Sequence, residues 1–316
     1  MSSEIMEMLK NGEILFLYPA QQFLYLELKK AGFYVEDPLI GRNNPLLRIA
    51  RELSFRTGDA FGELWYRKID LKKVQLIFAH EWYMNAPYVK WLKNRTKARI
   101  VVVFHNKIKT GEKPAALKAL GCELWSSDEE DCAKYDLQFY PFGVYLHTFS
   151  VRKTTPFYDT LYIGQAKPGR YQKLKELQTL FQSVGLRFKF HLATPLPFGI
   201  RTLRYGRKIP YSEILDELGK TRSILHLSEG AQSGITFRIV ESLVHGIKLI
   251  TDDQDIHNRT FYHPDNIFIL GRDQESRLPE FLKSDFVPAG PAYLDSFFID
   301  RFLQEIILQQ NEPAGF

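Results

Sequence analysis

The sequence predicts an α/β fold of two consecutive domains, each a parallel sheet covered by helices. The chain has 316 residues, which is above the size at which one hydrophobic core usually keeps growing, so two domains of about 150 residues are expected. Short apolar, β-branched runs alternate with helical patterns in both halves. Runs that are apolar on both faces are typical of parallel strands buried between helices.

The first half contains four strand-like segments before a final strand and helix. We expect strands at residues 13–19, 33–35, 74–81 and 99–105, with a helix over 21–30 closed by Gly32. A last strand at 124–127 is followed by a helix that Ser127 or Asp128 caps. Residues 138–155, which include Pro141 and Gly143, are expected to be the linker.

The second half restarts the pattern. Strands are expected at 159–164, 188–192 and 223–227, and helices at 171–184 and 211–219. Residues 232–246 then predict a helix that opens at Gly234, ends at Gly246 and leads into a buried strand at 247–251. This helix has an apolar stripe, with Arg238, Glu241 and His245 along its other edge.

These patterns give a domain division and a location for ligands. We expect a first domain at 1–150, a second at 151–290, and a C-terminal helix within 291–316 that packs back on the first domain. In open α/β sheets, ligands bind beyond the carboxyl ends of the strands. The residues at these ends are Pro19, His80, Glu81 and His105 in the first half, and Gly164, Ser228 and Gly234 in the second.

The segment around Gly234 has the properties of a phosphate site. Free backbone N–H groups at a helix start, no side chain at Gly234 and an arginine one turn later can all receive phosphate oxygens. The alternative is that Arg238 and Glu241 form an ordinary surface pair, which contributes only ~0.2–0.5 kcal/mol.

Composition narrows the class of protein. Apolar residues make up 45% of the chain and aromatic residues 14%, so packed cores are expected and disorder is not. The first ten residues lack the apolar core of a signal peptide, and no apolar stretch approaches the ~18 residues of a membrane span. Cys122 and Cys132 form no CxxC motif, so we expect reduced thiols and a cytoplasmic location.

Charge is unevenly spread. The net charge is +5, but residues 42–109 hold 15 lysines and arginines against five acidic residues, a local excess of ten positive charges. Residues 128–131 are all acidic and offset part of this excess. A basic half can hold the chain against a membrane, a phospholipid-linked substrate or nucleic acid, or it can be a solvated surface. No nucleic-acid-binding motif accompanies the charge, so we expect no nucleic-acid partner.

The chain resembles a known family at several of these segments. Residues 162–171, 232–241 and 248–251, with 125–135 and 140–142, are similar to bacterial lipopolysaccharide-core, capsule and exopolysaccharide glycosyltransferase-like proteins. The resemblance runs from about residue 14 to 270 and is strongest after Tyr158. It implies the GT-B fold, in which two Rossmann-like domains face each other across a crevice.

One position departs from the family pattern. Retaining members have two glutamates flanking seven residues; here Glu241 matches the second, but Ser233 stands where the first would be. Glu229, twelve residues before Glu241, could substitute only if its loop folds back. The sequence therefore leaves open whether the anomeric configuration is retained or inverted.

The resemblance implies an enzyme that transfers a sugar from a nucleoside-diphosphate sugar to a saccharide or lipid-linked saccharide. Arg238 would neutralise the departing diphosphate, and Glu241 would bind the ribose hydroxyls. The other expected donor-binding residues follow the strand ends: Gly164, Lys167, Arg170, Ser233, Gly234, Ile235 and Thr236. For Lys167 and Arg170, a solvated loop is the alternative.

The acceptor hydroxyl needs a base, for which Glu81 and His105 are candidates. Trp82 and Tyr83 could stack on a sugar, whereas His105 could instead be structural. We expect no metal or other cofactor, since no Asp-x-Asp stands in a setting that would bind a divalent ion. We also expect peripheral contact with an anionic membrane at its inner face.

Two other functions stay open. One is a catalytically silent GT-B-like protein that binds a nucleotide or saccharide and serves as an assembly partner. The other is transfer of a polyol phosphate, although its usual paired histidine signatures are not evident.

Overall fold

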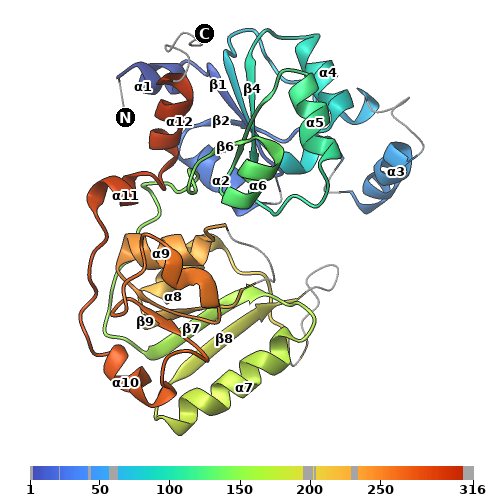
Figure 1. Ribbon diagram of the computed structural model, residues 1–316. Coiled ribbons are helices and arrows are strands. Elements are labelled where there is room, and N and C mark those ends of the chain that lie inside the picture. The colour runs from blue at the N-terminus through green and yellow to red at the C-terminus, as the bar shows by residue number, and fades with distance from the viewer. Residues whose placement is uncertain are drawn as a thin grey trace. The chain divides into compact units, whose positions relative to one another are not determined.

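The computed structural model describes residues 3–20, 22–41, 44–56, 63–194, 202, 204–228 and 234–308. The chain divides into two units (Figure 1). The N-terminal unit comprises Met1–Leu146 with Gln232–Gly234 and Ser296–Phe316, and the C-terminal unit comprises His147–Ala231 with Ile235–Asp295.

The N-terminal unit is built on a six-stranded parallel sheet with the order β2-β1-β3-β4-β5-β6. Its central strands are buried throughout, which explains why they are apolar on both faces. The order reverses between β1 and β3, so this gap is the switch point of the sheet. The strands are β1 (Ile14–Leu17), β2 (Tyr34–Glu36), β3 (Leu76–His80), β4 (Arg99–Phe104), β5 (Glu123–Ser126) and β6 (Gln138–Phe139).

Helices cover this sheet (Figure 1). They are α1 (Ser3–Lys10), α2 (Phe23–Lys30), α3 (Pro45–Arg56), α4 (Ala86–Lys93), α5 (Glu112–Ala119), α6 (Glu129–Tyr135) and α12 (Ile299–Leu308). The last helix comes from the far end of the chain: Phe302 stacks on Tyr140 at 4.1 Å between ring centroids and packs edge-on against Phe78 and Trp125.

The C-terminal unit has a five-stranded parallel sheet with the order β11-β10-β9-β7-β8. Its switch point lies between β7 and β9. The strands are β7 (Tyr158–Gln165), β8 (Phe188–Ala193), β9 (Thr221–His226), β10 (Lys248–Thr251) and β11 (Ile267–Ile269). The helices are α7 (Arg170–Ser183), α8 (Tyr211–Leu218), α9 (Phe237–His245), α10 (Leu278–Phe281) and α11 (Pro291–Asp295).

The two parallel sheets confirm the predicted fold class, and several details are corrected. Asp128 caps α6 by accepting a hydrogen bond from the Asp131 N–H, and α9 ends at Gly246, whose φ of 58° is left-handed. However, α9 begins at Phe237 after Thr236, not at Gly234. The expected linker also contains β6, which pairs with β5. No helix in the described ranges is long and apolar enough to cross a membrane.

Candidate functional site

Two arginines cross the switch point of the C-terminal sheet in opposite directions. Arg238 lies on α9, after β9, and its Nη2 donates to the Ile163 carbonyl of β7 at 3.3 Å. Arg170 opens α7, after β7, and its Nη1 donates to the Leu227 carbonyl, just past β9, at 3.4 Å. Both guanidinium groups therefore lie at the gap where α/β sheets of this strand order bind ligands. Planar, permanently charged guanidinium groups suit phosphate oxygens.

The Arg238 side chain is held by a buried network. Its Nη1 pairs with Glu241 Oε2, and the Tyr211 hydroxyl donates to Glu241 Oε1 at 2.7 Å. The side chain of Glu241 is 0% exposed and that of Arg238 is 20% exposed, so this is a buried pair rather than the surface pair considered above. Burial alone would lower the pKa of Arg238, but the Glu241 carboxylate raises it, so the guanidinium stays charged.

Glu241 has both carboxylate oxygens engaged inside the protein. Burial raises the pKa of Glu241, while Arg238 and Tyr211 act in the opposite direction. In this arrangement the carboxylate has no exposed surface with which to meet a ribose, and its contacts orient Arg238. Removing either partner would leave the other charge buried, which is costly.

Gly164 and Tyr162 position the second arginine. The Tyr162 hydroxyl accepts a hydrogen bond from Arg170 Nη1 at 3.1 Å. A Cβ at Gly164 would lie 2.5 Å from that hydroxyl oxygen, so the glycine leaves room for it. Gly169, with φ of 72°, makes the left-handed turn from which α7 begins.

Polar groups at the ends of β9 and β10 complete this edge. Asp252 accepts a hydrogen bond from the Ser228 N–H at 2.6 Å and pairs with Lys173 of α7. His226 lies 3.0 Å from the Thr251 hydroxyl through Nδ1. Burial lowers the pKa of His226, and the two arginines, Arg170 and Arg238, add to this effect, so the imidazole is neutral at pH 7.

The remaining donor-side residues lie around the helix starts. A cavity of about 500 Å³ adjoins the N-terminus of α7 and is lined by Lys167, Tyr171, Arg204 and Tyr205, among others. Thr236 is the N-cap of α9, and its buried hydroxyl has no hydrogen-bond partner among the described residues. Ile235 belongs to the C-terminal unit and Gly234 to the N-terminal unit, while Ser233 and Glu229 lie outside the described residues.

A second cluster occupies the switch point of the N-terminal sheet, centred on Glu81. This carboxylate is 6% exposed and accepts a hydrogen bond from Asn106 Nδ2 at 2.7 Å. Its Oε2 is 2.8 Å from His80 Nδ1. Burial opposes the charged form, but the bonds from His80 and Asn106 prevail and lower the pKa of Glu81 to about 2. Such a carboxylate is a weak base and a good hydrogen-bond acceptor.

The position of Glu81 fixes the orientation of His80. His80 Nδ1 lies 2.8 Å from a Glu81 carboxylate oxygen and 3.2 Å from the Trp82 backbone nitrogen, so a protonated Nδ1 donates to Glu81 and an unprotonated one accepts from the Trp82 N–H. The carboxylate favours the tautomer with the proton on Nδ1. The Nε2 atom then presents its lone pair, with Gln22 Nε2 3.5 Å away. The indole of Trp82 is 55% exposed, and its centroid is 5.3 Å from the His80 ring.

His105 lies beside this pair, just past β4, and is partly exposed. Its ring centroid is 4.9 Å from that of His80, and its Nε2 is 3.4 Å from the Tyr18 hydroxyl. Burial lowers the pKa of His105 to about 3, so the ring is neutral at pH 7. The sequence placed His80 at a strand end but did not indicate its pairing with Glu81.

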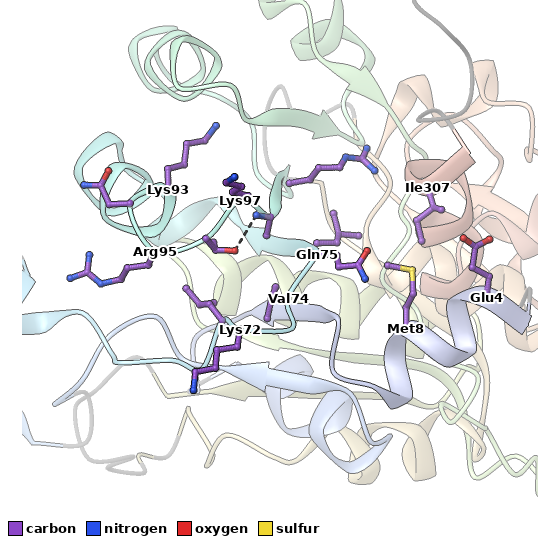
Figure 2. A pocket seen from close by; sticks show the side chains of 15 residues that line it. Glu4, Met8, Lys72, Val74, Gln75, Lys93, Arg95, Lys97 and Ile307 are labelled. Carbon is purple, nitrogen blue, oxygen red and sulfur yellow. Dashed lines mark hydrogen bonds between the residues drawn. The ribbon is translucent and has the colours of Figure 1, made fainter.

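The pocket shown in Figure 2 is larger than the cavity beside α7 and lies elsewhere, at about 820 Å³. Its lining includes Lys72, Lys93 and Lys97, together with Leu76 and Arg99, the first residues of β3 and β4. This is the amino edge of the N-terminal sheet, opposite to His80 and Glu81. Ligands of open α/β sheets bind at the carboxyl edge, so we place the candidate site there despite the size of this pocket.

Comparisons with solved structures show the fold. The chain is 10% identical to Anabaena Alr3699/HepE in complex with UDP and glucose, with a TM-score of 0.55 over 94% of this chain and 98% of that one. It is 12% identical to a putative UDP-N-acetylglucosamine 2-epimerase from Listeria monocytogenes, with a TM-score of 0.51 over 96% and 98%. No family model and no curated protein matches the chain. The two-domain Rossmann-like GT-B fold predicted from the sequence is confirmed.

Proposed function

We propose that the protein transfers a glycosyl group from a nucleoside-diphosphate sugar to a hydroxyl group of a saccharide acceptor. The pair of arginines at the β7/β9 switch point carries this proposal, because departure of a diphosphate needs positive charge fixed in advance. The similar fold of Anabaena HepE, which binds UDP and glucose, supports it.

In this proposal, Arg238 and Arg170 bind the diphosphate and Lys167 assists from the loop before α7. Gly164 keeps Arg170 in place through Tyr162, and the backbone N–H groups of Ile235 and Thr236 add donors. From the sequence, Glu241 was expected to bind the ribose hydroxyls. In this proposal it is instead a positioning residue that holds Arg238. The fixed guanidinium groups supply the charge that a divalent ion would otherwise supply, so we propose a reaction without a metal.

The N-terminal unit supplies the base. His80 Nε2 takes the proton of the acceptor hydroxyl, while Glu81 accepts from Nδ1–H and stabilises the imidazolium that forms. The sequence suggested Glu81 and His105 as bases. In this proposal, Glu81 is a positioning residue that orients His80, and His105 is a neutral side chain beside His80. Trp82 offers an exposed aromatic surface on which a sugar ring can stack.

The proposed acceptor is a lipid-linked saccharide or a surface polysaccharide. The proposed location is a bacterial cytoplasm, with the protein peripheral to the inner face of the membrane. The basic segment 42–109 supports contact with an anionic surface.

A two-stage experiment tests the reaction. The protein is first screened with a panel of nucleoside-diphosphate sugars for thermal stabilisation, because a ligand that binds the native state raises its stability. Donors that bind are then incubated with saccharide acceptors, and the release of nucleoside diphosphate and the glycosylated product are measured. Transfer supports the proposal. Binding with neither transfer nor hydrolysis points to the silent binding protein, and a changed sugar still linked to the nucleotide points to epimerisation.

A further inference from the structure

The strongest feature outside the candidate site is an exposed apolar surface on and beside α3. Among the described residues, thirteen large hydrophobic side chains are exposed, and six of them lie between residues 40 and 64. We name these six the α3 patch: Ile40 (40%), Leu46 (76%), Leu47 (43%), Ile49 (58%), Leu53 (55%) and Leu64 (67%).

The patch is built by the helical period. Leu46, Ile49 and Leu53 follow the i, i+3, i+7 spacing, which places them on one stripe of α3. Arg51 lies on the other side of the helix, is 2% exposed, and donates from Nη1 to the Ile40 carbonyl at 3.4 Å. The helix is therefore fixed to the N-terminal unit by a polar residue and turns its apolar stripe to solvent, at the periphery of that unit (Figure 1).

The chemistry of the patch selects its occupant. Its members are all leucine or isoleucine, whereas the cores of protein interfaces are enriched in aromatic residues and methionine. Besides the buried Arg51, the sequence of α3 carries Arg48 and Arg56 against one acid, Glu52. The helix lies within the basic segment 42–109, and Lys68 is exposed nearby. Aliphatic side chains combined with positive charge are typical of helices that lie in the interface of an anionic bilayer. Twelve residues span only about 18 Å, too short to cross a bilayer.

The segment before α3 connects the patch to the carboxyl edge of the N-terminal sheet. Asp37, just after β2, accepts hydrogen bonds at 2.9 Å from the N–H groups of Ala20 and Leu39. The adjoining chain is held to residues 64–66 by the bond from Ile40 N–H to the Trp65 carbonyl, also 2.9 Å. The switch point that holds Tyr18 and His80 is thus braced to the chain that leads into the patch.

We infer that α3 is a membrane-docking helix, whose Leu46, Ile49 and Leu53 enter the acyl boundary of an anionic bilayer. Docking here brings the cluster of His80, Glu81 and His105 to the lipid surface, where a lipid-linked acceptor is presented. This inference deepens the peripheral membrane location included in the proposed function. Membrane binding is measured without any sugar substrate, so its failure is distinguishable from a failure of glycosyl transfer.

Vesicle flotation of the full chain tests the inference. Wild-type protein is mixed with vesicles of phosphatidylcholine and phosphatidylglycerol at 7:3, and with phosphatidylcholine alone. We expect binding that is stronger on the anionic vesicles, and a loss of at least about 100-fold in partitioning for Leu46→Gln/Ile49→Gln/Leu53→Gln. The control variant Leu26→Gln/Val287→Gln/Leu308→Gln changes three exposed apolar side chains elsewhere and should bind like the wild type.

Because all of these side chains are exposed, both variants should keep the wild-type melting temperature. Absence of wild-type binding to the anionic vesicles would overturn the inference, and so would equal binding by the α3 variant. Concentration-dependent dimers that the α3 variant abolishes, without any vesicle binding, would assign the patch to a second copy of the chain instead.

Discussion

Arg170 and Arg238 each bond to the strand that the other follows: Arg238 reaches the Ile163 carbonyl of β7, and Arg170 reaches the Leu227 carbonyl just after β9. This reciprocal arrangement fixes two positive charges at one switch point. The neutral His226 and the Lys173–Asp252 pair lie at the ends of the neighbouring strands.

Loss of Arg238 should lower turnover far more than it lowers donor affinity. A single alanine substitution would leave Glu241 buried without its cation, at a cost of about 3–5 kcal/mol, so the variant to measure is Arg238→Ala/Glu241→Gln. We expect its kcat at saturating donor and acceptor to fall by ~10²-fold or more. Arg238→Lys should turn over faster than this double variant but more slowly than the wild type, because an ammonium cannot make the two parallel hydrogen bonds of a planar guanidinium.

The control for this experiment is Arg187→Ala. Arg187 also pairs with a carboxylate, Asp159, but at the amino end of β7, away from the switch point. Its turnover should match the wild type. A double variant of Arg238 and Glu241 that retained wild-type turnover would remove the catalytic role of Arg238.

Glu241 should act on the donor through Arg238. Glu241→Gln and Tyr211→Phe both disturb the buried network, so both should lower the melting temperature, Glu241→Gln more strongly. We also expect both to weaken binding of a nucleoside diphosphate, measured by calorimetry, by roughly tenfold for Glu241→Gln. Tyr158→Phe, at the amino end of β7, is the matched control. Lower stability with unchanged nucleotide affinity would reduce the network to a structural role.

Substitutions in the N-terminal cluster should separate the three candidate bases. We expect His80→Ala to lower kcat by ~10²–10⁴-fold with donor affinity unchanged, and added imidazole to restore part of the rate. Glu81→Gln should lower kcat less and respond less to imidazole, since it leaves the base in place but unoriented. His105→Gln should have the smallest effect. A larger loss in His105→Gln than in His80→Ala would reverse the assignment.

Folding stability should decline as the pH falls from 6.5 toward 3. Burial lowers the pKa of His105 to about 3 and that of His245, with help from Lys153, to about 4, against a normal value near 6.5. Below pH 6.5 the unfolded chain therefore binds protons that the native state does not, and the free energy of unfolding falls with pH. Urea unfolding from pH 7 to 4 measures this slope. It should be shallower in His105→Gln, and an identical slope would contradict the assigned pKa shift of His105.

The strands were predictable because central parallel strands are buried on both faces, as β1 and β3 are. The helix starts were less predictable. The sequence suggested that α9 begins at Gly234, but it begins three residues later, at Phe237, and α3 was not predicted. At the site, local sequence showed Arg238 and Glu241 one turn apart. It could not show that Tyr211, thirty residues away, donates a hydrogen bond to Glu241, or that the side chains of His80 and Glu81 contact each other. Such contacts depend on tertiary packing.

We assign the diphosphate of a nucleotide donor to the β7/β9 switch point. Calorimetric titration of the wild-type chain and of Arg170→Gln with UDP and with UMP tests this assignment directly. We predict that UDP binds the wild type at least about tenfold more tightly than UMP, because the second phosphate meets the two guanidinium groups, and that Arg170→Gln loses most of this difference. Equal affinity of the wild type for UDP and UMP would contradict the claim.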